Sequence, residues 1–152
     1  MKVIRFLLCV TFVLVLSKSA FAFQNEPDGF RGIKWGEKID KLKGMTFVEK
    51  GVDTDLYERN TDGRHIGDAI VKKTRYVFKD GAFVMVHIEY EGESNFKKLI
   101  KYFSKEHGSP TVKDVFQYPE KGSLWQSSNN SLSIAVGYNP TTKKGVIVYV
   151  KK

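Results

Sequence analysis

The stretch TRYVFKDGAFVMVHIEY, residues 74–90, decides the fold class of this chain. It contains two runs of strand-forming residues on either side of Asp80-Gly81. An Asp-Gly pair in this setting is a strong signal for the two-residue turn of a β-hairpin, because both turn positions need a positive φ angle. The sequence therefore predicts a long antiparallel hairpin, with one strand at 69–79 and the other at 83–91.

The second strand of this hairpin carries the first candidate site. Side chains alternate between the two faces of a strand, and we assign one set to the core: Val84, Val86, Ile88 and Tyr90. The less buried face then holds Phe83, Met85, His87 and Glu89. A His–Glu pair on an accessible face is a candidate for acid–base chemistry. The structural alternative is a histidine that a loop or a helix covers.

An amphipathic helix is predicted after the hairpin. Its apolar residues recur at the i, i+3, i+4 and i+7 spacing of a helix that lies on a sheet: Phe96, Leu99, Ile100 and Phe103. Ser94 is a suitable N-cap, and Gly108 followed by Pro110 marks the end. Much of the outer face is basic, with Lys97, Lys98, Lys101 and Lys105. Such a face is either a solvated helix surface or a docking surface for an anionic lipid, an anionic polymer or an acidic partner.

The remaining segments complete the predicted order of elements. A short helix is expected at 37–43, because Ile39 and Leu42 share one helical face and Gly44 follows as a stop. Further strands are predicted at 46–50, 56–59, 115–118, 123–126, 131–138 and 146–150. The order is then short helix, four strands, long helix, four strands. It favours an α+β fold with antiparallel sheet, and the repeated helix-plus-strands pattern suggests a duplicated unit.

Residues 1–22 are typical of a cleavable signal peptide. An apolar run from Phe6 to Leu16 follows two basic residues, and it is shorter than the roughly 20 apolar residues that a stable membrane span needs. Ala20 and Ala22 form the small-x-small pattern of a cleavage site, so the cut is expected before Phe23. The alternative is an uncleaved anchor helix.

We therefore expect residues 23–152 to form a single exported domain, periplasmic or secreted, with no stable membrane span once the signal is removed. The signal would carry away Cys9, which is the sole cysteine, so no disulfide is expected. It would also lower the formal net charge by three, from +8 to +5, because it contains three basic and no acidic residues. An exported address makes nucleic acid an unsuitable partner.

The segment GFRGIKWG, residues 29–36, resembles the opening of a group of short, uncharacterised, exported bacterial proteins that begin with F-x-G-I-x-W-G after a signal peptide. Members of that group tend to have a later helix that ends in a glycine-proline break and then a tryptophan strand. The matching positions here are His107-Gly108-Ser109-Pro110 and Leu124-Trp125. The resemblance implies export and a single domain. It implies no catalytic or binding residue.

Catalytic and cofactor motifs are not found in the sequence. His65, His87 and His107 do not have metal-ligand spacing, and no phosphate-binding glycine loop or nucleophile motif is present, so no metal or cofactor is expected.

Trp125 is either a core residue or part of an exposed aromatic platform. The leading hypothesis is a non-catalytic module that binds another envelope protein or an anionic envelope polymer. Its candidate surface comprises Trp125, Phe83, Met85, His87 and Glu89, and the alternative is a small periplasmic enzyme that uses His87 and Glu89.

Overall fold

A computed structural model of the chain describes residues 23–115 and 120–152. The proposed signal peptide lies outside the described residues, as does most of the strand predicted at 115–118. Every buried core side chain that the structure describes lies between Phe30 and Tyr149. The chain from Phe23 onward therefore contains the whole of this core.

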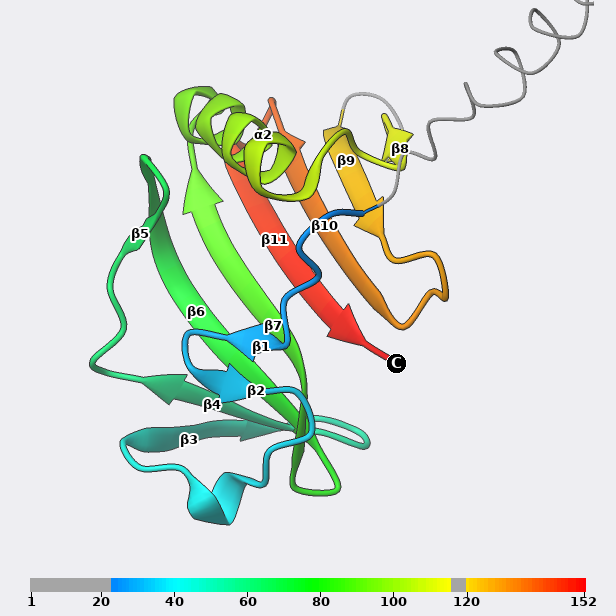
Figure 1. Cartoon of the computed structure of the whole chain (residues 1–152). Helices are drawn as coiled ribbons and strands as arrows, with labels where there is room; N and C mark the ends of the chain where they lie inside the picture. Colours follow the sequence, from blue (N-terminus) through cyan, green and yellow to red (C-terminus); the bar gives the residue numbers. More distant parts are fainter. Residues whose placement is uncertain (1–22, 116–119) are drawn as a thin grey trace, which may run out of the picture.

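One antiparallel sheet dominates the molecule (Figure 1). Its order is β3-β4-β6-β7-β11-β10-β9-β8, so two runs of consecutive strands meet where β7 pairs with β11. A short β5 pairs with β6, and β1 pairs with β2 in a separate hairpin. The strands are β1 (Gly29–Phe30), β2 (Ile33–Lys34), β3 (Met45–Lys50), β4 (Asp55–Arg59), β5 (His65–Ile66), β6 (Ala69–Lys79), β7 (Ala82–Glu91), β8 (Val112–Lys113), β9 (Lys121–Gln126), β10 (Leu132–Asn139) and β11 (Lys144–Lys151).

The helix α2 (Glu93–His107) covers one face of this sheet. Leu99 and Phe103 are fully buried, and Phe96 and Ile100 pack against the core, as the predicted apolar stripe requires. The helix begins at Glu93, one residue before Ser94, which the sequence predicted as the N-cap. The N-cap position is instead Gly92, at φ 86°. Gly108 follows at φ 80° and ends the helix where it was expected.

The predicted α+β fold, with its order of a short helix, four strands, a long helix and four strands, is wrong. The described residues form a β-rich fold with α2 as their one α-helix, and the segment predicted as a short helix contains only a 3₁₀ turn, η1 (Ile39–Lys41). Its backbone pairs with the β6–β7 turn: Ile39 N donates to Gly81 O at 2.9 Å, and Phe83 N donates to Glu37 O at 3.0 Å. The backbone N–H of Ile39 and the C=O of Glu37 are thereby bonded to the hairpin and cannot form hydrogen bonds within an α-helix. The second helix that a duplicated helix-plus-strands unit needs is therefore missing from the described residues.

The β6–β7 hairpin has the predicted turn but a different arrangement of side chains. Asp80 and Gly81 adopt φ angles of 51° and 73° and form the two-residue loop. Phe78 pairs with Phe83 and Val77 with Met85, so Val84 is an extra residue, a β-bulge. The bulge shifts the alternation, and Phe83 enters the core with Val86 instead of lying on the outer face with Met85.

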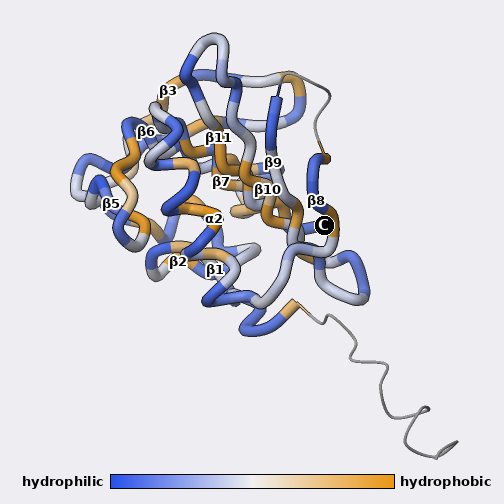
Figure 2. The backbone as a smooth tube through the Cα atoms, turned by 90° about the horizontal axis from the view of Figure 1, so that it is seen from above, coloured by the Kyte–Doolittle hydropathy of each residue, from blue (hydrophilic) through white to orange (hydrophobic). Residues whose placement is uncertain are grey.

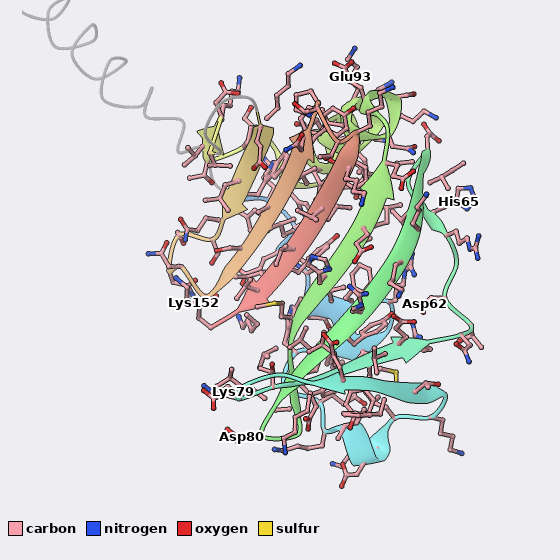
Figure 3. The ribbon with its side chains drawn as sticks, turned by 180° about the vertical axis from the view of Figure 1, so that it is seen from behind. Asp62, His65, Lys79, Asp80, Glu93 and Lys152 are labelled. Atoms are coloured by element: carbon pink, nitrogen blue, oxygen red, sulfur yellow. The ribbon has the colours of Figure 1, made fainter. Side chains whose placement is uncertain are left out.

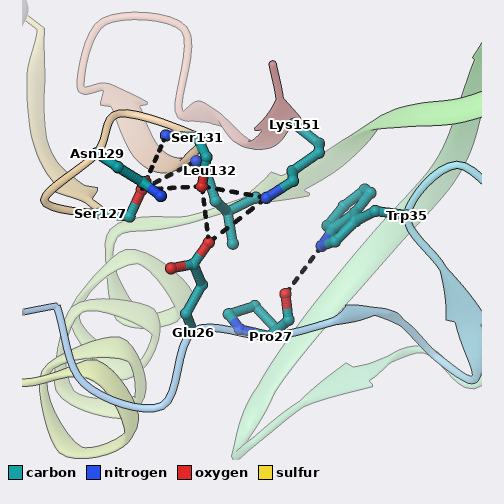
Figure 4. A network of polar contacts seen from close by, with 8 residues as sticks. All are labelled: Glu26, Pro27, Trp35, Ser127, Asn129, Ser131, Leu132 and Lys151. Carbon is teal, nitrogen blue, oxygen red and sulfur yellow. Dashed lines mark hydrogen bonds and ion pairs between the residues drawn. The ribbon is translucent and has the colours of Figure 1, made fainter.

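The first described residues make hydrogen bonds to three other parts of the domain. Gln24 N donates to His107 O at 3.0 Å, at the end of α2. Glu26 accepts a hydrogen bond from Ser131 Oγ at 3.1 Å and lies 3.6 Å from Lys151 Nζ (Figure 4). Trp35 Nε1 donates to Pro27 O at 2.9 Å. This segment thus bridges the helix, the β9–β10 turn and the end of β11.

The core lies between the sheet and a layer made of α2 and the segment from Phe23 to Gly44, and we name this side of the sheet the closed face. Phe30 packs 5.1 Å from Tyr149, and Trp35 stacks 4.7 Å from Phe83, so the N-terminal segment extends the cover that α2 begins. Figure 2 shows hydrophobic segments gathered in the central strands, with hydrophilic loops around them. The opposite side of the sheet is not covered in this way.

Candidate surface on the open face of the sheet

The uncovered side of the central strands, which we name the open face, presents a row of apolar side chains without any aromatic member. Figure 3 looks onto it: no helix lies in front of β7, β11 and β10, and the β3–β4 hairpin crosses only the lower ends of β6 and β7. The apolar members are neither fully buried nor fully exposed: Met85, Leu124, Ala135, Val146, Val148 and Val150. Strand alternation explains them, because Ile147 and Tyr149 point to the closed face and are buried. A partner can therefore reach this surface without any rearrangement of the fold.

Strand pairing aligns the apolar row with a histidine. His87 lies opposite Arg75 on β6 and opposite Val148 on β11. The same row continues through Ala135 on β10 to Leu124 on β9. One end of the row is thus charged and the other end is aliphatic, and the sheet backbone fixes the spacing between them.

Paired charges occupy the β4–β6 end of the open face. Arg75 Nη1 lies 2.6 Å from Glu89 Oε1, and Arg75 Nε lies 3.5 Å from Glu58 Oε1. Lys73 Nζ lies 3.3 Å from the same Glu58 oxygen. Arg75 therefore lies between carboxylates from two neighbouring strands, with a charge-assisted hydrogen bond to Glu89 and a longer contact to Glu58.

His87 does not form a dyad with Glu89. The two are on the same face of one strand, but the short hydrogen bond of Glu89 goes to Arg75. The pKa of His87 is lowered, chiefly because burial disfavours the imidazolium; Arg75 also lowers it, and Glu89 acts in the opposite direction. His87 is thus favoured as a neutral ring, without the oriented carboxylate that a catalytic histidine uses.

Two shallow hollows lie on this face, on either side of Val146 and Lys144. The larger, about 330 Å³, is bounded by Lys72, His87 and Glu89. The smaller, about 220 Å³, lies over Gly137, where no side chain fills the space. Each has room for one or two side chains of a docking partner.

The structure separates the five residues of the predicted surface. Met85, His87 and Glu89 lie together on the open face, as the sequence predicted. Trp125 and Phe83 do not: both are buried, and placing them on an exposed surface was wrong. Trp125 points to the closed face, where its Nε1 donates to Gly108 O at 2.9 Å and its ring lies 5.5 Å from Phe103. Phe83 is displaced to that side by the bulge at Val84.

Most of the open face lies outside the surface that the sequence predicted. A signal for it was present in β11, where the run Val146-Ile147-Val148-Tyr149-Val150 is apolar at every position. A strand with one solvated face alternates between apolar and polar residues, whereas a run of this kind indicates apolar side chains on both faces. The contribution of Arg75 and Glu58 depends on strand pairing and had no such signal.

A second polar cluster lies on the closed side and joins four segments of the chain. Asp62 accepts hydrogen bonds from Tyr76 Oη at 2.5 Å and from Arg59 Nε at 2.6 Å, and Arg31 Nη1 lies 3.3 Å away. Burial and the neighbouring Asp62 carboxylate raise the pKa of Tyr76, so its hydroxyl stays protonated and donates. Since these contacts are directed inward between β4, β6 and two turns, we interpret this cluster as structural.

Two further observations limit the kinds of site in the described part of the chain. Within residues 23–115 and 120–152, no three His, Cys, Asp or Glu side chains gather closely enough to hold a metal ion. Over the same residues, no helix combines the length and the apolar character needed to cross a bilayer.

Comparisons with models of known protein families, with curated protein sequences and with solved structures find no match to this chain.

Proposed function

We propose that this protein is an exported, non-catalytic binding module whose open face docks on another protein of the cell envelope. The observation that carries the proposal is the row of partly buried apolar side chains on β7, β11 and β10, on a sheet face that no helix covers. A contiguous apolar surface bordered by polar groups is typical of a protein interaction site.

The charges beside the row support a protein partner with a defined orientation. Arg75 is already hydrogen-bonded to Glu89, so less conformational entropy is lost when a partner contacts this pair. The aliphatic residues would supply the apolar contact, and the fixed charges would select the direction in which the partner lies. The enzyme alternative has no comparable support, because the carboxylate of Glu89 is bound to Arg75 and not to His87.

Export is the second part of this proposal, and it rests on the signal-like residues 1–22. The N-terminus of the protein recovered from cells tests it. The expected result is a chain that begins at Phe23. An intact Met1 in the membrane fraction would contradict cleavage and favour the anchored form.

Site-specific photo-crosslinking in cells tests the binding surface. A benzophenone amino acid replaces Val148 on the open face, and in a matched control it replaces Val52, which is 97% exposed but lies in the β3–β4 loop. We expect a discrete adduct with a second protein from position 148 and none from position 52. Met85→Lys, which places a charge in the neighbouring strand of the same face, should abolish the adduct.

Two results would overturn the proposed partner. If position 148 gives no adduct beyond that of position 52, the open face is not an interaction surface. If the adduct from position 148 consists of two copies of this chain, the face serves self-association and not another envelope protein.

A further inference from the structure

The outer face of α2 carries a line of lysines that the proposed binding function does not use. We name Lys97, Lys98, Lys101 and Lys105 the lysine stripe; all four are exposed. With 3.6 residues per turn, these positions fall within about 100° of the helix circumference and extend over about 12 Å of its length. They therefore form one basic strip on the side of α2 that faces away from the sheet.

Most of this positive charge is not neutralised by the protein. Lys97 Nζ lies 3.5 Å from Glu93 Oε1, and the same carboxylate also lies 3.6 Å from Lys121 Nζ. In the part of the chain that the structure describes, no carboxylate lies within 4.0 Å of the other three lysines of the stripe. Three cations are thus available to an external anion.

The shape of the stripe favours an extended anionic surface over a small ligand. None of the hollows described above is lined by these lysines. Lysine ammonium groups act as point charges on flexible stems, and they lack the planar fork with which arginine clamps a single phosphate. A line of lysines on a convex helix fits a surface that offers many negative charges in one plane.

The chain enters the domain at one end of this helix. The Phe23 ring stacks 5.0 Å from the His107 ring, and Asn25 Nδ2 donates to Glu106 O at 2.8 Å. Only residues 17–22 separate Phe23 from the apolar run 6–16, and they extend over at most about 25 Å. While residues 1–22 are still attached and that run is inserted in a bilayer, the end of α2 that carries Lys105 stays within about 25 Å of the membrane.

We propose that the lysine stripe binds the anionic phospholipid headgroups of a membrane surface, and that α2 lies against that surface. The stripe is separate from the open face, so this proposal does not depend on the protein partner. A lysine at an anionic membrane surface strengthens binding by about fivefold, so three of them contribute on the order of a hundredfold. The attraction weakens as salt is added, because these charges are exposed.

Vesicle co-sedimentation of the chain 23–152 tests the proposal. The vesicles contain mixed phosphatidylglycerol and phosphatidylcholine, and phosphatidylcholine alone serves as the neutral comparison. The stripe variant is Lys98→Gln/Lys101→Gln/Lys105→Gln. The matched control is Lys41→Gln/Lys43→Gln/Lys50→Gln, which removes the same charge from exposed lysines at the end of the molecule distant from α2 (Figure 1). Circular dichroism confirms that all forms are folded.

The expected result is binding of the wild-type chain and of the control to the anionic vesicles, and a loss of about a hundredfold in the stripe variant. Equal losses in both variants would show that net charge alone acts, and would overturn the proposal. No loss in the stripe variant would also overturn it. If the stripe binds soluble dextran sulfate but not the anionic vesicles, the anionic partner is a polymer and the assignment to lipid is wrong.

Discussion

The two faces of the central sheet are built from the same strands, yet they differ in the kind of side chain they present. The closed face holds large aromatic residues, such as Trp125, Tyr76 and Phe83, which are fully buried under α2 and the N-terminal segment. The open face holds small aliphatic residues, such as Val148 and Ala135, beside paired charges. The core therefore depends on the closed face, whereas the open face leaves part of its apolar surface in contact with solvent.

The two polar clusters differ in the same way. Asp62 joins β4, β6 and two turns through inward contacts, and its side chain is 9% exposed. Arg75 joins carboxylates across three neighbouring strands on the open face, where its partner Glu89 is 42% exposed. Removing one member of an enclosed cluster leaves its partners buried and unpaired, whereas an exposed ion pair contributes little to stability.

The largest effect expected is the loss of the aromatic core. Trp125→Ala should lower the free energy of unfolding by about 3–5 kcal/mol, because it removes a fully buried ring and leaves a cavity. Val148→Ala on the open face should cost below about 1 kcal/mol. Urea denaturation of both variants measures the difference. Similar losses in the two variants would show that the open face is part of the core.

A second comparison tests the bulge at Val84. Phe83 and Met85 are two residues apart and would share a face on a regular strand. In the structure Phe83 is 1% exposed, whereas Met85 is only partly buried. We expect Phe83→Ala to cost about 3 kcal/mol and Met85→Ala about 1 kcal/mol. The same denaturation experiment applies. If Met85→Ala costs as much as Phe83→Ala, the register at Val84 is not the one described.

A third comparison sets the two charge clusters against each other with one type of substitution. Asp62→Asn should destabilise the protein by about 2 kcal/mol, because Arg31 and Arg59 lose their shared counter-charge. Glu89→Gln should cost at most about 1 kcal/mol, because the ion pair is partly solvated. Thermal melts in matched buffer rank the two. An equal loss would assign the open-face cluster a structural role.

The smallest effect concerns the protonation of His87, which faces Glu89 and Arg75. Its pKa in the folded protein is lowered from 6.5, so above that pH the ring is neutral in both states and its full contribution to stability is present. As the pH falls below 6.5, the unfolded chain takes up the proton first and stability declines until the folded pKa is passed. His87→Gln should therefore make the decline between pH 7 and 5 shallower. Identical slopes for the two proteins would remove His87 as a cause.

Local patterns predicted some elements well and others wrongly, for identifiable reasons. The Asp80-Gly81 turn and the apolar stripe of α2 depend on neighbouring residues, so both were found. The short helix at 37–43 looked equally plausible, but its backbone groups bond to the β6–β7 turn. Phe83 was assigned to the wrong face because the bulge at Val84 depends on the partner strand.

The candidate site was predictable only in part. Met85, His87 and Glu89 share a face through strand alternation alone, and the sequence placed them together. Arg75 and Val148 join them through pairing with β6 and β11, and β11 is distant in the sequence. Periodicity within one strand does not identify its neighbours, so the composition of the open face could not be read from it.

By itself, the sequence determined the hairpin, the amphipathic helix with its lysines and the signal-like N-terminus, because each depends on short-range periodicity or turn chemistry. Only the tertiary structure decided which face of the sheet is covered and what lies beside His87. It also decided that the chain from Phe23 lies against the end of α2. These features depend on contacts between segments far apart in the chain, where backbone hydrogen bonds and burial outweigh local preference.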